Sequence, residues 1–202
     1  MLINSKLLNR LSLIVSVVMV GFMGYLTLKS YIFVDTHHID IQGSTYVHQV
    51  STKPYVKHIA LKLTEHCKSD ACAIQELLNY VTTISYKINP SISRSPKNTI
   101  KNGYGDCDDK SNLLISMLHS LGYEAYFVLV PGHIFTIVKL DDKRYSHFKG
   151  LYVNGTKYYI LESTAKMSPI GFPLKYSLDK IKAIVDPFSN TKVDIKQLEW
   201  KI

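Results

Sequence analysis

The chain has 202 residues, of which 46% are hydrophobic and 20% charged, a composition typical of folded proteins that excludes wholesale disorder. This length allows one globular domain of ordinary size and leaves residues over for a tail or an anchor. The formal net charge is +8, but no run of five or more Lys or Arg residues indicates a nucleic-acid-binding arm. We therefore expect a single domain that does not bind nucleic acid.

An uncharged apolar stretch, LSLIVSVVMVGFMGYLTL, runs from Leu11 to Leu28 and is about long enough to cross a bilayer core. Two basic residues precede it, and after Lys29 no Lys or Arg follows until Lys53, so the positive charge favours a cytoplasmic N-terminus. A cleaved signal peptide is one alternative, although no A-x-A-like site follows, and a buried core helix is another. We expect residues 1–33 to form an uncleaved signal anchor that crosses the cytoplasmic (inner) membrane once, with the domain on the periplasmic or extracytoplasmic side.

Residues 34–52 are predicted to be a spacer or a first short strand, and residues 53–202 to be the domain. The spacer carries His37, His38 and His48, but no Cys or carboxylate arrangement supports a metal site around them. We therefore expect solvated histidines and no bound metal.

Two helices are predicted at the start of the domain. The first begins near Pro54, a residue suited to a first helical turn, and carries apolar side chains up to Leu63. The second begins at a cap supplied by Ser69 or Asp70, and its apolar face ends at Val81.

Between these helices, Cys67 and Cys72 lie in the sequence CKSDAC. In the cytosol they would be free thiols or weak metal ligands, whereas the oxidising compartment implied by the signal anchor favours a disulfide. The loop it closes is short, so we expect it to stabilise the fold by on the order of 2 kcal/mol. Pairing these two leaves Cys107 as an odd thiol in an exported protein.

The remaining chain predicts helices first and strands afterwards. A loop reaches Pro96, a short helical turn ends at Gly103, and a longer helix runs from Asp106 to a stop at Gly122. Three strands are then expected, at Tyr123–Val130, His133–Leu140 and Thr156–Thr164. A polar excursion at 141–155 separates the second strand from the third, and a short tail helix is expected at Leu178–Val185. The excursion ends in Asn154-Gly155, which is a strong hairpin signal. This order predicts an α+β domain in which N-terminal helices pack on an antiparallel sheet.

Cys107 is predicted to occupy the first position of the longer helix. Asp106 would cap that helix, with Asp109 completing an acidic form of the capping box. The helix dipole favours a thiolate there, but the charges of Asp106, Asp108 and Asp109 favour the neutral thiol. A cationic partner is therefore needed for reactivity. The three aspartates lack the full loop spacing of a calcium site, so we interpret them as caps and solvated charges.

His133 and Glu162 are the candidate partners of Cys107. An ordinary strand histidine and an edge carboxylate are the alternative interpretations of these two residues. If Leu140 lies opposite Gly155 in an antiparallel pair, His133 lies opposite Glu162, with Cβ atoms roughly 5 Å apart. This pairing requires that residues 141–155 do not insert a strand between the two partners, because an inserted strand would move Glu162 to the far end of the sheet.

The string GDCDDKSNLLISMLHSLGYEAYFVLVPGHIFTIV, followed by YYILEST, resembles the transglutaminase-like superfamily of cysteine enzymes. The resemblance covers roughly residues 84–171. It implies a catalytic triad of Cys107, His133 and Glu162. We expect no cofactor. The family usually has aspartate as the third residue, and glutamate occurs in membrane-anchored members. The resemblance further places Tyr86, in ISYKINP, near the oxyanion position.

The resemblance implies acyl transfer from an amide to the Cys107 thiol. We expect a membrane-anchored peptidase or amidase that acts on protein, peptide or peptidoglycan amides. Two alternatives stay open: a protein-glutamine acyltransferase, that is, a true transglutaminase, and a catalytically idle binding module on the same fold. The sequence does not define the oligomeric state.

Overall fold

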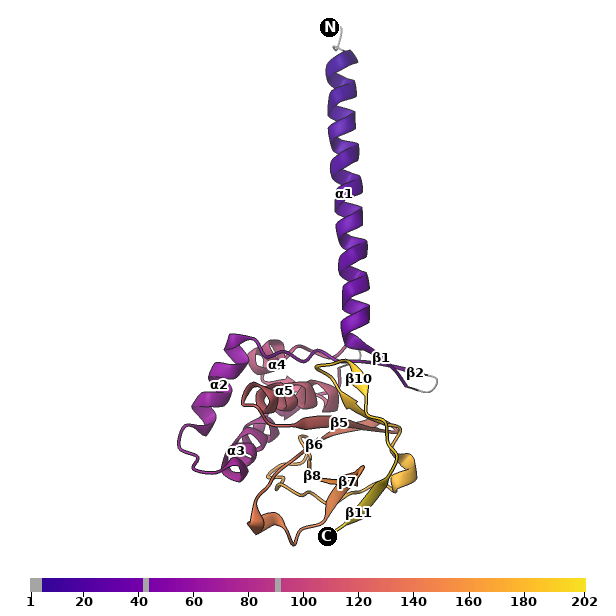
Figure 1. The fold of residues 1–202 in the computed structure, drawn as a ribbon. Helices are drawn as coiled ribbons and strands as arrows, with labels where there is room; N and C mark the ends of the chain where they lie inside the picture. The colour runs from indigo at the N-terminus through magenta and orange to yellow at the C-terminus, as the bar shows by residue number, and fades with distance from the viewer. Residues whose placement is uncertain (1–4, 42–43, 90–91) are drawn as a thin grey trace. The chain divides into compact units, whose positions relative to one another are not determined.

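The structure is a computed structural model that describes residues 5–41, 44–89 and 92–202 (Figure 1). The chain separates into two compact units, with the boundary between His38 and Ile39. The first unit consists of helix α1 (Ser5–His37). Residues Leu8–His37 of this helix are long and apolar enough to cross a membrane, with a mean hydropathy of 2.2 in the most apolar part. The helix extends beyond the predicted apolar stretch at both ends.

The second unit begins with a helical half. Its helices are α2 (Pro54–Thr64), α3 (Asp70–Thr83), α4 (Pro96–Asn102) and α5 (Cys107–Ser120). These elements confirm the predicted helices. Of the two predicted caps for α3, Ser69 is the one used, because its hydroxyl accepts a hydrogen bond from the backbone N–H of Cys72 at 3.3 Å.

The strands of the second unit form a large antiparallel sheet and two small pairings. Two-residue strands β3 (Ser85–Tyr86) and β4 (Tyr104–Gly105) pair in parallel, and β1 (His38–Ile41) pairs with β2 (Ser44–Val47). The large sheet consists of β5 (Ala125–Val130), β6 (His133–Val138), β7 (Gly150–Val153), β8 (Thr156–Leu161), β9 (Ala183–Asp186), β10 (Thr191–Lys192) and β11 (Leu198–Lys201). Their order in the described chain is β10-β9-β5-β6-β8-β7-β11.

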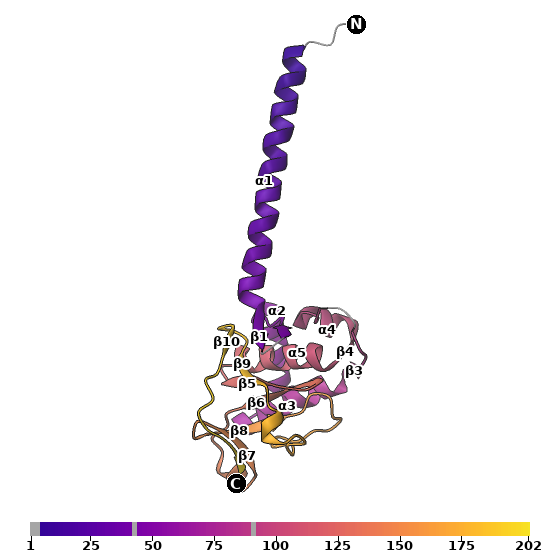
Figure 2. The same ribbon diagram turned by 90° about the vertical axis from the view of Figure 1, so that its right-hand side faces the viewer.

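Helices and sheet form two layers, which confirms the predicted α+β architecture (Figures 1 and 2). Helix α5 packs on β5 and β6, and α2 and α3 pack against α5 in turn. The core between the layers includes fully buried residues from both, such as Leu114, Met117 and Phe127. A second apolar cluster, which includes Phe135 and Ile160, lies on the opposite face of the sheet. The segment from Phe172 to Ile181 packs against this second cluster.

The register between β6 and β8 differs from the prediction by two residues. Thr136 lies opposite Leu161, and Val138 lies opposite Tyr159. Continuing this register beyond the end of β8 puts Glu162 level with Phe135 rather than with His133. The predicted direct pairing is therefore wrong. Because side chains alternate with a period of two, the shift keeps both residues on the same face of the sheet.

Residues 141–155 contain a strand, β7, that the sequence analysis did not predict. It forms a hairpin with β8 through Asn154-Gly155, where both residues have positive φ (51° and 84°), as the sequence indicated. β7 lies on the outer side of β8, so β6 and β8 remain neighbours. The requirement that no strand separates them is therefore fulfilled.

The C-terminal tail corrects a second prediction. Only Leu178–Lys180 forms a 3₁₀ turn, and the rest of the expected helix is strand β9, which lies between β10 and β5. Val185 packs into the core under the helices and Ile184 into the cluster on the other face. A strand buried on both faces has no polar alternation, so its short apolar run is easily confused with a helix.

His48 also differs from the prediction, because it is buried rather than solvated. Its Nε2 atom lies 2.8 Å from the side-chain oxygen of Asn190. A buried imidazole needs such a partner to offset the loss of hydration. This histidine therefore connects the segment after β2 to the turn before β10.

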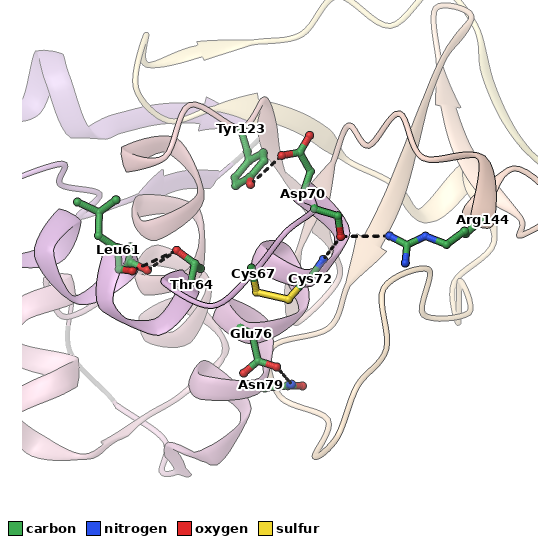
Figure 3. The surroundings of a disulfide bond; sticks show 11 residues. Leu61, Thr64, Cys67, Asp70, Cys72, Glu76, Asn79, Tyr123 and Arg144 are labelled. Carbon is green, nitrogen blue, oxygen red and sulfur yellow. Dashed lines mark hydrogen bonds between the residues drawn. A yellow bond between two sulfur atoms is a disulfide. The ribbon is translucent and has the colours of Figure 1, made fainter.

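Cys67 and Cys72 form a disulfide, as predicted from the sequence (Figure 3). The bridge spans the connection between α2 and α3, and the two Cα atoms are 5.4 Å apart. Ser69, inside the bridged segment, also accepts a hydrogen bond from Arg144 at 3.1 Å. The disulfide and this contact fix the start of α3 against the loop that precedes β7.

Candidate active site

The first turn of α5 forms the predicted capping box around Cys107. The carboxylate of Asp106 accepts a hydrogen bond from the N–H of Asp109 at 3.1 Å, and that of Asp109 accepts one from the N–H of Asp106 at 3.4 Å. Gly105 is required here, because a Cβ atom at this position would lie 2.6 Å from the Cβ of Asp109. Local sequence thus places Cys107 at the first position of the helix.

Asp106 and Asp109 also hold the loop that precedes α4. Asp106 accepts a hydrogen bond from the N–H of Asn89 at 2.9 Å. Asp109 accepts one from the N–H of Arg94 at 2.5 Å and forms an ion pair with the Arg94 guanidinium. Both carboxylates are buried. Two of the three aspartates are therefore structural, and neither is a solvated charge as the sequence analysis expected.

The half-buried thiol of Cys107 lies between Asp108 and the start of β6. It donates a hydrogen bond to Asp108 at 3.8 Å, and the backbone N–H of Ile134 is also within hydrogen-bonding reach of the sulphur. Burial and then the charges of Asp108 and Asp106 raise the pKa of the Cys107 thiol to about 12, against the lowering effect of the N–H groups of Asp108 and Ile134. The thiol is therefore protonated at neutral pH.

His133 and Glu162 form a hydrogen-bonded pair. His133 Nε2 lies 2.9 Å from Glu162 Oε2, and the two side chains are 18% and 10% exposed. The second oxygen of Glu162 accepts hydrogen bonds from the N–H of Thr164 at 3.0 Å and its hydroxyl at 2.5 Å. Burial alone would raise the pKa of Glu162, but the hydrogen bonds from His133 and Thr164 outweigh it and lower the pKa.

The structure brings the three predicted triad residues to one end of β6. The N–H of Ile134 reaches the Cys107 sulphur, so the thiol lies next to the backbone of the residue that follows His133. Glu162 meets His133 diagonally across the strand pair, a spacing that long side chains can bridge. With Nε2 bound to Glu162, Nδ1 is the other ring nitrogen of His133 that can exchange a proton.

Tyr86 lies close to the same site. Tyr86 is opposite Gly105 in the β3–β4 pairing, and Gly105 lies two residues before Cys107. The Tyr86 residue is 55% exposed. Burial and then the charges of Cys107 and Asp106 raise the pKa of the Tyr86 hydroxyl. That hydroxyl is therefore within electrostatic range of the thiol, on the side formed by β3 and β4.

Lys110 is a site residue that the sequence analysis missed. It is almost completely buried, and its Nζ donates a hydrogen bond to the carbonyl of Ile84 at 2.9 Å. Burial lowers the pKa of Lys110, and the nearby charge of Glu162 opposes that effect. This contact ties α5, which carries Cys107, to the residue that precedes β3, which carries Tyr86. A lysine three residues after Cys107, within an apolar helix pattern, was the available signal.

Two pockets flank the site and meet at Thr164. We call the first, of about 440 Å³, the aromatic pocket. Its lining includes His133, Phe135, Glu162, Phe172, Leu174 and Tyr176. The second, of about 460 Å³, is the Tyr86 pocket, whose lining includes Thr82, Ser85, Tyr86, Lys110, Lys166 and Met167. Both pockets share Thr164, which holds Glu162 in place.

Sequence comparison identifies relatives of part of the chain. Residues 57–154 match the sequence model of the transglutaminase-like superfamily. UPF0252 protein MJECL39 of Methanocaldococcus jannaschii is 39% identical over 54 residues, which are 27% of this chain and 15% of that protein. The chain therefore spans only a small part of the length of this relative.

Two crystal structures of bacterial proteins show a partial likeness. One, from Cytophaga hutchinsonii and proposed to be a cysteine protease, has 17% identity and a TM-score of 0.44, covering 58% of this chain and 39% of that one. The other, from Parabacteroides distasonis and proposed to be a protease, has 15% identity and a TM-score of 0.46, covering 70% and 27%.

The superfamily match covers the segment that forms most of the site. It includes the helices α3 to α5, Tyr86, Cys107 and His133, and it ends before Glu162. The resemblance expected from the cysteine motif is thus confirmed by an independent comparison. Residues 57–154 of the chain therefore form a domain of the transglutaminase-like superfamily.

Proposed function

We propose that this chain is a membrane-anchored cysteine enzyme that cleaves amides on the extracytoplasmic side of the membrane, with Cys107 as nucleophile. The observation that carries the proposal is the hydrogen bond between His133 and Glu162, formed beside the backbone N–H that contacts the Cys107 sulphur. A base oriented by a carboxylate, next to a thiol at a helix start, is the arrangement that nucleophilic catalysis needs.

In the proposed acylation step, the sulphur of Cys107 attacks the carbonyl carbon of the amide and the thiol proton moves to Nδ1 of His133. Because the resting thiol is neutral, this proton transfer accompanies the attack and does not precede it. The carbonyl electrons form an oxyanion, which the backbone N–H of Cys107, at the first position of the helix, and the hydroxyl of Tyr86 stabilise. Glu162 stabilises the imidazolium that results.

The tetrahedral intermediate then collapses. His133 donates its proton to the nitrogen of the amide, the carbon–nitrogen bond breaks, and the amine leaves behind an acyl thioester on Cys107. In hydrolysis, His133 removes a proton from water as the water attacks the thioester, and the acid and the thiol are released. In transfer, an amine takes the place of water.

Two features support an extracytoplasmic location. Helix α1 is long and apolar enough to serve as an anchor. The disulfide between Cys67 and Cys72 is of a kind that persists in oxidising compartments. Peptides, proteins and peptidoglycan are the amides available there, so we propose a peptidase or amidase.

A true transglutaminase would use the same residues and differ only in the acceptor of the acyl group. A peptide library is incubated with the protein, with and without an added primary amine, and the products are analysed by mass spectrometry. This measurement separates hydrolysis from transfer. Free acids alone indicate hydrolysis, and amine adducts indicate transfer. An idle binding module would give neither product, and its Cys107→Ala variant would behave like wild type.

Alkylation of Cys107 by iodoacetamide tests the thiol and base assignment in the full-length, detergent-solubilised chain. Cys107 is the free cysteine, so the reagent reports on one site. We expect labelling at pH 7 to 8 to slow about tenfold or more in His133→Ala, because the base that takes the proton is lost. His119→Ala, on α5, is the matched control. Equal, slow labelling of wild type and His133→Ala would contradict the proposal.

A further inference from the structure

The aromatic pocket lies beside the proposed triad but is formed largely by chain outside the superfamily match. Phe172, Leu174 and Tyr176 come from the segment that follows β8 and covers the face of the sheet opposite α5. His133 and Glu162 line the same pocket. A substrate group that reaches past His133 would therefore enter this pocket.

The wall of the pocket consists of a row of rings that starts at the catalytic base. The rings of His133 and Tyr176 are stacked with centroids 6.1 Å apart, and those of Phe135 and Tyr176 are stacked at 6.4 Å. Lys175 covers the ring of Phe172, with Nζ 4.9 Å from its centroid. Aromatic walls of this kind favour apolar and aromatic ligand groups.

The carboxylate in the pocket is already occupied by hydrogen bonds. Glu162 accepts three from His133 and Thr164, so binding a polar ligand group there would break an existing contact. The volume of the aromatic pocket, about 440 Å³, lies in the range of pockets that enclose small ligands, roughly 300–1,000 Å³. The volume suits one large side chain, and the ring wall formed by Phe135 and Tyr176 suits an apolar or aromatic one.

The position of the pocket relative to the triad determines which half of a substrate it receives. Tyr86, proposed for the oxyanion, lines the other pocket and lies on the β3–β4 side of Cys107. The nitrogen of the amide must lie near His133, because His133 gives it a proton. The aromatic pocket begins at His133 and therefore adjoins the amine half of the substrate.

We infer that the aromatic pocket binds a large apolar or aromatic side chain on the amine half of the substrate. In hydrolysis this is the residue that follows the cleaved amide, and in transfer it is the acceptor amine. The inference rests on the proposed function for the reaction, but the binding itself can be measured without turnover. Tyr176 is assigned as the specificity-determining residue because its ring faces both His133 and Phe135.

Binding of L-phenylalaninamide and of glycinamide to the full-length Cys107→Ala variant, followed by ligand-observed NMR in one detergent, tests the pocket. We expect L-phenylalaninamide to bind about tenfold or more tightly than glycinamide, as apolar pockets discriminate by such factors. Adding Tyr176→Ala should remove that preference, and Tyr176→Phe should keep it. Tyr55→Ala, on the exposed side of α2, is the matched control and also corrects for binding to micelles. Equal binding of both amides, or a preference unchanged by Tyr176→Ala, would overturn the inference.

A kinetic measurement separates failure of the pocket from failure of the proposed reaction. In a peptide series that varies only the residue after the cleaved amide, kcat/KM should favour Phe and Leu over Gly in wild type and not in Tyr176→Ala. Cleavage without such a preference would overturn the pocket assignment and leave the reaction intact. Selective binding of L-phenylalaninamide without any cleavage would instead overturn the reaction and support the pocket as an apolar amine site.

Discussion

The two halves of the proposed site are built in different ways. At the start of α5, Cys107 is positioned by residues within a few positions of it, through the capping box of Asp106 and Asp109 and the close approach at Gly105. At the end of β6, the pairing of His133 with Glu162 joins residues 29 positions apart and depends on the register of two strands. One half is local, and the other requires the folded sheet.

The two halves also differ in charge. The start of α5 gathers three carboxylates, and Asp109 forms an ion pair with Arg94. The end of β6 balances one carboxylate with one imidazole and two Thr164 donors. The helix start therefore opposes ionisation of the thiol, and the strand end carries His133, the group that we propose accepts its proton. Each half is chemically incomplete without the other.

Asp109→Asn should have the largest effect on the helix half. The Asp109 side chain is fully buried, pairs with the Arg94 guanidinium, and accepts the N–H groups of Arg94 and Asp106. Its loss removes the carboxylate that faces the partly buried Arg94 cation, whose side chain is 20% exposed. We expect the free energy of unfolding to fall by about 3–5 kcal/mol. Urea titration, followed by the fluorescence of Trp200, the single tryptophan, measures this change in the free energy of unfolding.

Arg94→Ala and the double variant complete a mutant cycle for this pair. The double variant should be less destabilised than the sum of the single variants, because no charge is then left buried and unpaired. Additive effects would mean that the ion pair does not hold the loop to α5. The position of Cys107 would then depend only on α5 and its cap, without support from the loop before α4.

Glu162→Gln tests the strand half and should have a somewhat smaller effect. The folded-state pKa of Glu162 lies below its unfolded value, so the ionised carboxylate contributes stability above about pH 4.3, which is lost as the pH falls further. We expect a loss of about 1.5–3 kcal/mol at pH 7, because hydrogen bonds to a charged group are broken.

Unfolding of wild type and Glu162→Gln at pH 7 and at pH 3 measures this dependence. The difference between the two proteins should shrink at pH 3, because the unfolded wild-type carboxyl binds a proton there and the advantage of the ionised form is reduced. Glu65→Gln, at an exposed position after α2, is the control and should show no such change. A difference that is constant with pH would contradict the ionised hydrogen bond between the two strands.

Removal of the disulfide should have a smaller effect still, and it should leave both halves of the site intact. The Cys67→Ser, Cys72→Ser variant opens a loop with a sequence separation of 5, for which about 2 kcal/mol is the expected loss of stability. The rate at which iodoacetamide labels Cys107 should be unchanged. A large change in that rate would show that the start of α3 also supports the site, and that the site is not formed by the start of α5 and the end of β6 alone.

The local half of the site was predictable from sequence, and the non-local half only in outline. The cap at Asp106 and the stop at Gly122 follow from helix-end chemistry within a few residues, and both are present. The sequence named His133 and Glu162 correctly as partners but with the wrong register. It treated Leu140 as part of β6, whereas the strand ends at Val138.

Features made by the tail were beyond sequence reasoning for a physical reason. β9 lies between two strands and is buried on both faces, so Ile184 and Val185 show no alternation that marks a strand. Tyr176 lies in an irregular segment whose position is set only by packing against the sheet. Because no local periodicity encodes such contacts, the aromatic pocket became visible only in the folded structure.

Asp108→Asn should have the smallest effect, a severalfold change in the rate at which iodoacetamide labels Cys107. It is also the sharpest test of whether the helix half controls ionisation of the thiol. Asp108 is the aspartate that faces the thiol, and after burial its charge is the largest cause of the raised pKa of Cys107. Removing that charge should lower the pKa of the thiol, so iodoacetamide should label Cys107 severalfold faster at pH 8. Asp141→Asn, at an exposed position after β6, is the matched control.

The pH dependence of this effect has a defined sign. Burial and the charge of Asp106 raise the pKa of Asp108 to about 6, so below that value wild-type Asp108 is itself neutral. The labelling rates of wild type and Asp108→Asn should therefore converge as the pH falls through about 6 and separate above it. Rates that stay equal at pH 8 would show that Asp108 does not restrain the thiol, and that the helix half controls the position of Cys107 but not its ionisation.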